Sequence, residues 1–109
     1  MGIGPAVAIP KALEKAGLTV EDIDIFEINE AFASQCFYSV DKLKIPMEKV
    51  NPKGGAIALG HPFGMTGARQ IGTLVHELRR RGDRYGVVSM CIGSGQGAAA
   101  VFEAFPDRA

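Results

Sequence analysis

The stretch Asp24-Ile-Phe-Glu-Ile-Asn29, followed by Glu30-Ala-Phe-Ala-Ser-Gln-Cys-Phe-Tyr-Ser-Val-Asp-Lys-Leu43, carries the pattern that decides the fold. The first part alternates polar with apolar side chains and contains β-branched and aromatic residues, which predicts a short strand. The second part repeats apolar side chains every three or four positions, which predicts a helix; these are Phe32, Cys36, Val40 and Leu43. A strand that leads directly into a helix is typical of an α/β layer fold.

Helical spacing also precedes this stretch, and an extended segment follows it. Pro5 or Pro10 can open a helix and Gly17 is placed to end it, so we expect a helix over roughly residues 5–16. Pro46 breaks the pattern of the second helix. Val50-Asn-Pro52 then begins a second extended or loop segment.

The C-terminal part predicts one more helix and two strands. Residues 67–81 repeat apolar side chains on one helical face, and Gly82 is placed to end that helix. Residues 85–91 and 97–103 are apolar runs joined by a glycine-rich loop, which predicts an antiparallel pair. The order αβαβαββ predicts the α/β class, with helices layered on a mixed sheet.

Composition narrows the classes of function before any motif is considered. Lys plus Arg and Asp plus Glu each number 12 in 109 residues, so no net charge attracts nucleic acid or an anionic membrane surface. No stretch approaches the ~18 uninterrupted apolar residues of a membrane span. We therefore expect one soluble domain, residues 1–109, with neither nucleic acid nor membrane as a partner.

The two cysteines, Cys36 and Cys91, do not form a disulfide scaffold or a CxxC metal pair, which favours an intracellular location and no bound metal. Cys36 falls mid-helix at a core-facing position and is interpreted as a packing residue. The run Arg79-Arg80-Arg81 crowds the last turn of its helix. A solvated basic face explains that run better than phosphate binding does.

Three polar sites lie at predicted element ends, where side chains can reach a shared cleft: Asn29-Glu30, His61 and Cys91. Taken singly, each has an ordinary structural interpretation. Asn29 can be a helix N-cap, His61 a structural histidine and Cys91 a buried thiol. Because each terminates an element at the same edge, we expect the three to converge on one cleft.

Three sequence blocks change this balance. They are Asn29-Glu-Ala-Phe-Ala33, Gly60-His61-Pro62 and Cys91-Ile-Gly93-Ser-Gly95, and they resemble the NEAFA, GHP and CxG blocks of thiolases in order and separation. The segments at residues 1–5, 24–29 and 87–91 look most like the peroxisomal 3-ketoacyl-CoA branch of that family. The resemblance implies the C-terminal half of a thiolase fold, with the first strand of that half missing.

The resemblance also implies a two-step acyl transfer in which a nucleophilic cysteine attacks a 3-ketoacyl-CoA, acetyl-CoA leaves, and CoA takes the shortened acyl group. His61 corresponds to the histidine that activates that nucleophile and helps bind the thioester oxyanion. Cys91 corresponds to the acid/base cysteine at the α-carbon. Asn29 corresponds to the residue that holds a water in one oxyanion site, and Gly93 to a backbone donor in the other. Glu30 and Gly60 are supporting residues.

Further expectations concern what surrounds these residues in a complete enzyme. The nucleophile belongs to an N-terminal thiolase half, which is absent from this sequence. CoA and acyl-CoA are substrates, no cofactor is implied, and the complete enzyme is expected to be a peroxisomal homodimer; cytoplasm and mitochondrion are the alternatives. The chain departs from the branch pattern at Phe63, Met65 and Gln96, which puts acyl-length preference in doubt.

Other functions stay open at this point. The acid/base pair of His61 with Cys91 argues against decarboxylating ketoacyl synthases, which resemble thiolases but bring paired histidines, or histidine with asparagine, to the second site. A biosynthetic acetoacetyl-CoA thiolase portion is a nearby alternative to a degradative one. A truncated isoform, or a fragment that serves only in interaction or oligomerisation, is the alternative without catalysis. We expect no turnover from the chain alone.

Overall fold

The computed structural model describes residues 2–105 and contains a three-stranded mixed sheet. Its strands are β1 (Ile25–Ile28), β2 (Tyr85–Ile92) and β3 (Gln96–Glu103), in the order β1-β2-β3. β1 runs parallel to β2, with Phe26 opposite Val87, and β2 runs antiparallel to β3, with Val87 opposite Val101. The predicted mixed sheet is therefore confirmed.

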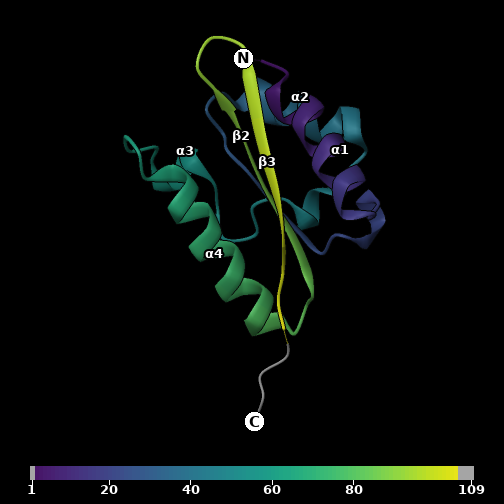
Figure 1. Cartoon of the computed structure of the whole chain (residues 1–109). Helices are drawn as coiled ribbons and strands as arrows, with labels where there is room; N and C mark the ends of the chain where they lie inside the picture. Colours follow the sequence, from purple (N-terminus) through teal and green to yellow (C-terminus); the bar gives the residue numbers. More distant parts are fainter. Residues whose placement is uncertain (1, 106–109) are drawn as a thin grey trace.

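Helices cover both faces of this sheet (Figure 1). Helices α1 (Gly4–Ala16) and α2 (Ala33–Leu43) lie on one face, and α3 (Ala56–Leu59) and α4 (Thr66–Arg81) lie on the other. Two short 3-10 turns, Val20–Asp22 and Met47–Lys49, lie in the connections before β1 and after α2. The result is a sheet enclosed between two helical layers, as expected for this order of elements.

The alternation of β1 divides the core into two clusters. Phe26 and Ile28 pack into the larger cluster with residues of α1 and α2, while Ile25 packs with Leu74 and Leu78 of α4. Because successive strand residues point to opposite faces, the even-numbered residues of β1 face α1 and α2 and the odd-numbered residues face α4. This assignment places Glu27 and Asn29 on the α4 side.

Helix α1 begins and ends close to the proline and glycine from which its ends were predicted. Pro5 lies in the first turn, and Gly17 ends the helix with φ of 70°, a left-handed conformation that glycine adopts without steric cost. The amide of Gly17 donates to the Glu14 carbonyl oxygen, so the last turn is closed. Gly82 ends α4 in the same way, with φ of 71°.

Two predicted elements differ from the structure. Helix α2 begins at Ala33 and not at Glu30, since Phe32, its N-cap, has an extended backbone conformation. The extended segment at Val50 forms one bridge to Phe26 and no full strand. Asn51 explains this ending: its side-chain amide donates to the Ile28 carbonyl and accepts from the Ile28 amide, both at 2.9 Å, so a side chain takes the place of the next backbone pair. None of the helices within residues 2–105 has the length and apolar character to span a membrane.

Candidate active site

Two of the predicted site residues, Asn29 and Cys91, lie at the carboxyl end of the parallel strand pair, with their side chains on opposite faces of the sheet by strand alternation. Ile28 is opposite Ser89, and the Asn29 amide donates to the Ser89 carbonyl at 2.9 Å, so the ladder extends one step past β1. Cys91 follows two positions later on β2, where it pairs with Gly97 of β3. Parallel strands have their carboxyl ends at the same end of the sheet, and Asn29 and Cys91 both lie at that end.

The side chain of Asn29 is buried, with 1% of its surface exposed. Neither its amide oxygen nor its amide nitrogen has a hydrogen-bond partner among the described residues. The N-cap interpretation is wrong, because Phe32 occupies the N-cap position of α2. An unpaired buried polar group costs about 1–3 kcal/mol, so the Asn29 amide is available for a ligand or an ordered water.

Cys91 is a half-buried free thiol whose backbone is held by the start of α1. Gly4 approaches so closely that a Cβ atom on it would lie 3.2 Å from the Cys91 Cα and 2.9 Å from the Gln96 carbonyl oxygen. The same is true in reverse, since a Cβ on Gly97 would lie 2.4 Å from the Gly4 carbonyl oxygen. These two glycines let α1 fix the end of the hairpin where Cys91 lies.

Gly93 and Gly60 both adopt backbone conformations that favour glycine. Gly93 lies in the turn between β2 and β3 with φ of 59°, and Gly60 follows the last residue of α3 with φ of 103°. A side chain at either position would be strained. Gly60 thus turns the chain out of α3 immediately before His61, while the donor role of Gly93 stays a prediction.

Glu30 connects the end of β1 to the start of α3. Its Oε1 accepts a hydrogen bond from the Ile57 amide at 3.2 Å. Gly55 makes room for this carboxylate, because a Cβ there would lie 2.2 Å from Oε1 and 2.8 Å from the Asn51 side-chain nitrogen. Glu30 therefore holds the short helix that precedes His61, while its supporting role in the reaction stays a prediction.

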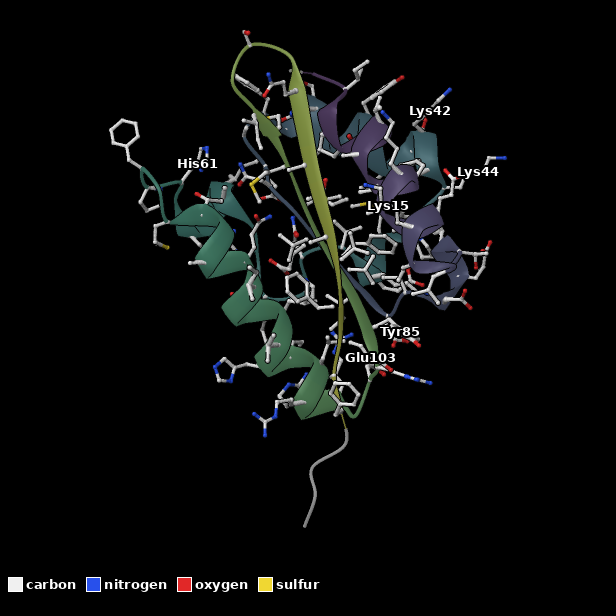
Figure 2. All side chains as sticks on the ribbon, viewed as in Figure 1. Lys15, Lys42, Lys44, His61, Tyr85 and Glu103 are labelled. Atoms are coloured by element: carbon white, nitrogen blue, oxygen red, sulfur yellow. The ribbon has the colours of Figure 1, made fainter. Side chains whose placement is uncertain are left out.

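His61 lies on the exposed loop between α3 and α4. Figure 2 shows it at the end of the molecule where the β2–β3 turn also lies. Its Nδ1 is hydrogen-bonded to the Thr66 hydroxyl, which lies 3.5 Å from the Pro62 carbonyl oxygen. If that hydroxyl donates to Pro62 and accepts from Nδ1–H, Nε2 is the unprotonated nitrogen that a base requires.

The hydrogen bonds of residues 2–105 include none between His61 and Cys91. The structure thus brings Asn29, Glu30 and Cys91 to one edge and places His61 one short helix away from Glu30. Convergence of all three predicted catalytic side chains on one cleft stays a prediction. A cavity of about 570 Å³ lies elsewhere, between the end of α4 and the end of β3, and none of the predicted site residues lines it.

A buried polar cluster that the sequence patterns did not predict lies between β1 and α4, next to Asn29. Glu27 is fully buried, and the Arg69 guanidinium donates to its Oε1 at 3.0 Å. Gln70 donates through Nε2 to the Glu27 carbonyl at 3.1 Å and the Ser89 carbonyl at 3.2 Å. Burial raises the pKa of Glu27 to about 7, although Arg69 acts in the opposite direction. Helices on both sides of the strand were the signal that Glu27 could not be exposed.

The remaining candidates behave as packing or surface residues. Cys36 is buried, and burial together with the negative charge of Glu30 raises its thiol pKa to about 11, so it is a poor nucleophile. Arg80 and Arg81 bind Glu77 of the same helix through their Nε atoms at 3.0 and 2.8 Å. The bond from Arg80 lowers the pKa of Glu77 to about 2. Within residues 2–105 no cluster of three or more His, Cys, Asp or Glu side chains is suited to a metal ion.

Comparison with known proteins identifies the family. The family model described as "Thiolase, C-terminal domain" matches residues 1–104. Over 104 residues, the chain is 79% identical to 3-ketoacyl-CoA thiolase B, peroxisomal, of Rattus norvegicus and 76% identical to 3-ketoacyl-CoA thiolase, peroxisomal, of Homo sapiens. Each match covers 94% of this chain and 24% of the relative, so the chain spans about a quarter of the length of these curated relatives.

Solved structures agree with the sequence match. Peroxisomal 3-ketoacyl-CoA thiolase of Saccharomyces cerevisiae, described as five layers built from two core domains of identical topology, superposes with a TM-score of 0.91 at 65% identity, over 96% of this chain and 30% of that one. Human mitochondrial 3-ketoacyl-CoA thiolase in complex with CoA gives 0.93 at 53% identity, over 95% and 26%. The motif blocks, the mixed sheet and these matches together show that the chain belongs to the thiolase family and corresponds to its C-terminal domain.

Proposed function

We propose that this chain forms the acid/base and oxyanion-stabilising part of a degradative 3-ketoacyl-CoA thiolase. The reaction is the cleavage of 3-ketoacyl-CoA by CoA into acetyl-CoA and a shortened acyl-CoA, as in fatty-acid β-oxidation. The observation that carries the proposal is that Asn29 and Cys91 share one sheet edge in a chain 79% identical to a peroxisomal 3-ketoacyl-CoA thiolase.

In the first step, a cysteine thiolate from the N-terminal half attacks the 3-keto carbon, and the bond between C2 and C3 breaks. The electron pair of that bond goes to the acetyl unit, which takes a proton at C2 from the Cys91 thiol and leaves as acetyl-CoA. His61 accepts the proton of the attacking thiol through its free ring nitrogen.

In the second step, a CoA thiol gives its proton to the Cys91 thiolate and attacks the carbonyl carbon of the acyl-enzyme. The bond from that carbon to the N-terminal cysteine sulfur breaks, and the cysteine leaves as a thiolate that takes back its proton from His61. Negative charge develops on carbonyl oxygen in both steps. Asn29 holds a water at one oxyanion site, and the backbone amide of Gly93 donates at the other. The unpaired amide of Asn29 supports this assignment, since a donor aimed at an oxyanion must be kept free of other partners.

The same reasoning extends to partners and location. CoA and acyl-CoA are substrates and not resident cofactors. We assign the complete enzyme to the peroxisome as a homodimer, with support from the peroxisomal relatives and from the yeast structure described as dimeric. Large apolar side chains support the need for an N-terminal half, because Ile57 and Phe63 near His61 are 68% and 107% exposed.

The experiment that tests this function compares three purified proteins: the chain alone, the chain mixed with a separately made N-terminal half, and the complete enzyme. Each is given 3-ketoacyl-CoA and CoA, and acetyl-CoA is measured. We expect turnover from the complete enzyme, recovery of some turnover from the mixture, and none from the chain alone, because covalent catalysis lacks its nucleophile there.

Three outcomes would contradict the proposal. Turnover by the chain alone that survives Cys36→Ala would show that the missing half is not needed. A complete enzyme without turnover would favour the alternative of a non-catalytic interaction fragment. A complete enzyme that only condenses two acetyl-CoA molecules would favour the biosynthetic alternative.

A further inference from the structure

The polar cluster between β1 and α4 is defined by Glu27, Arg69 and Gln70, and it lies directly behind Asn29. Glu27 and Gln70 have no exposed surface, and the Arg69 side chain is 14% exposed. Glu27 and Asn29 are two residues apart on an extended strand, so their side chains point to the same face with Cβ atoms about 7 Å apart. One ordered water can span most of that separation.

The cluster also touches the backbone of the site. The side chain of Gln70 donates to the backbone carbonyl oxygen of Ser89. The same oxygen accepts a hydrogen bond from the backbone N–H of Asn29. A shift of Gln70 therefore acts on a backbone hydrogen bond that holds Asn29 at the end of β1. Arg69 is the neighbour of Gln70 on α4, and its bond to Glu27 fixes both side chains against the strand.

Five buried polar atoms of this region have no hydrogen-bond partner among the described residues. They are Glu27 Oε2, Arg69 Nε, Gln70 Oε1, Asn29 Oδ1 and Asn29 Nδ2. Two of them are donors and three are acceptors, a mixture that ordered water satisfies and that an apolar neighbour does not. Each costs about 1–3 kcal/mol when it stays unpaired, so protein packing alone does not account for them.

We propose that Glu27, with Arg69 and Gln70, positions the side-chain amide of Asn29 for the thiolase reaction. Ordered water held between this cluster and Asn29 connects the two. The inference rests on the function proposed above. An amide side chain can turn its oxygen or its nitrogen toward a ligand, and only polar neighbours distinguish the two orientations. The ion pair of Glu27 and Arg69 favours one orientation of the Asn29 side-chain amide over the other. Glu27 is therefore a positioning residue that does not touch the substrate.

The competing interpretation is an ion pair that serves only packing. A positioning role and a packing role can be separated by experiment. Replacing both partners of a buried ion pair by apolar residues of similar volume often leaves protein stability unchanged or raises it, whereas removing one partner lowers stability strongly. The double substitution Glu27→Met with Arg69→Met, called here the pair variant, keeps the volume and removes the charges. It tests positioning without leaving one charge unpaired.

The experiment is a double-mutant cycle in the complete enzyme: wild type, Asn29→Ala, the pair variant, and all three substitutions together. The measurements are kcat and KM for thiolysis, with the thermal midpoint of each protein. We expect the pair variant to unfold near the wild-type temperature, to lose at least 10-fold in kcat, and to keep its KM within 2-fold. In the Asn29→Ala background the pair substitutions should then change kcat by less than 2-fold, because Glu27 acts through Asn29.

The inference is overturned if the pair variant keeps wild-type kcat, or if it loses the same factor with and without Asn29. Should the pair variant fail to fold, Gln70→Met replaces it in the same cycle, and equal losses in both backgrounds again overturn the inference. A complete wild-type enzyme without thiolysis overturns the proposed function itself, and this inference with it. Thiolysis by wild type together with additive losses overturns the inference alone.

Discussion

Substitution of Gly55 by alanine tests how the chain holds the loop that carries His61. The added Cβ would lie 2.2 Å from Glu30 Oε1, whereas ordinary contact begins at 3.4 Å, so the carboxylate must move by about 1.2 Å. That movement breaks its bond to the Ile57 amide, which is already 3.2 Å long. Overpacking costs about 1–3 kcal/mol and the lost hydrogen bond about 1 kcal/mol. Since Glu30 is half-exposed and can partly relax, we expect a total near 2 kcal/mol.

The assay uses the complete enzyme, with thermal denaturation for stability and kcat/KM for activity. Displacement of α3 moves His61, and a misplacement of about 1 Å costs on the order of 100-fold in rate. Gly72→Ala is the matched control, since nothing lies within 4 Å of that position, and alanine in the helix should stabilise by about 0.5–1 kcal/mol. Adding Glu30→Ala to Gly55→Ala should restore the part of the stability that overpacking costs, but neither the hydrogen bond to Ile57 nor the activity. A Gly55→Ala enzyme as stable and active as wild type would show that Glu30 does not hold α3 and His61 in place.

Three further predictions concern the core, the hairpin and pH. Leu74→Ala should cost about 2.7–5 kcal/mol in chemical denaturation, because this side chain has no exposed surface; a loss below 1 kcal/mol would contradict its place in the core. Gly97→Ala should destabilise more than Gly86→Ala, since its neighbour is Gly4 backbone and not the movable Leu74 side chain; the reverse order of melting temperatures would contradict this. Between pH 4.5 and about 7, Glu27 is more fully protonated in the folded protein than in the unfolded chain. The free energy of unfolding should therefore fall by about 3 kcal/mol as pH rises through that window. Glu27→Gln should flatten this part of the profile, and an unchanged slope would contradict the raised pKa.

Local sequence patterns predicted those parts of the fold that local physics controls. Pro5 and Gly17 marked the ends of α1 because a fixed φ suits the first turn and a left-handed residue suits the end. The alternation in residues 24–29 marked β1 because one set of side chains packs on α1 and α2. The edge shared by Asn29 and Cys91 followed from the rule that parallel strands end together.

Long-range contacts decided what the sequence could not predict. Helix α2 begins late, and the Glu30 side chain binds Ile57, a residue far along the chain. The second extended segment is a single bridge because the Asn51 side chain takes over the ladder. The alternation in residues 24–29 did not indicate whether Glu27 is buried; α4 covers its face of the strand, and the side chain has no exposed surface.

We propose that this domain supplies the acid/base chemistry of a thiolase, with Cys91 acting at the α-carbon and His61 acting on the nucleophile. The most direct measurement compares two partial reactions of the complete enzyme: deuterium exchange into the methyl group of acetyl-CoA in D₂O, and transfer of an acyl group onto the nucleophile. Cys91→Ser should impair exchange far more than acyl transfer, and His61→Ala should impair both, because it removes a base and an oxyanion partner together. Equal loss of both partial reactions in Cys91→Ser would contradict the account.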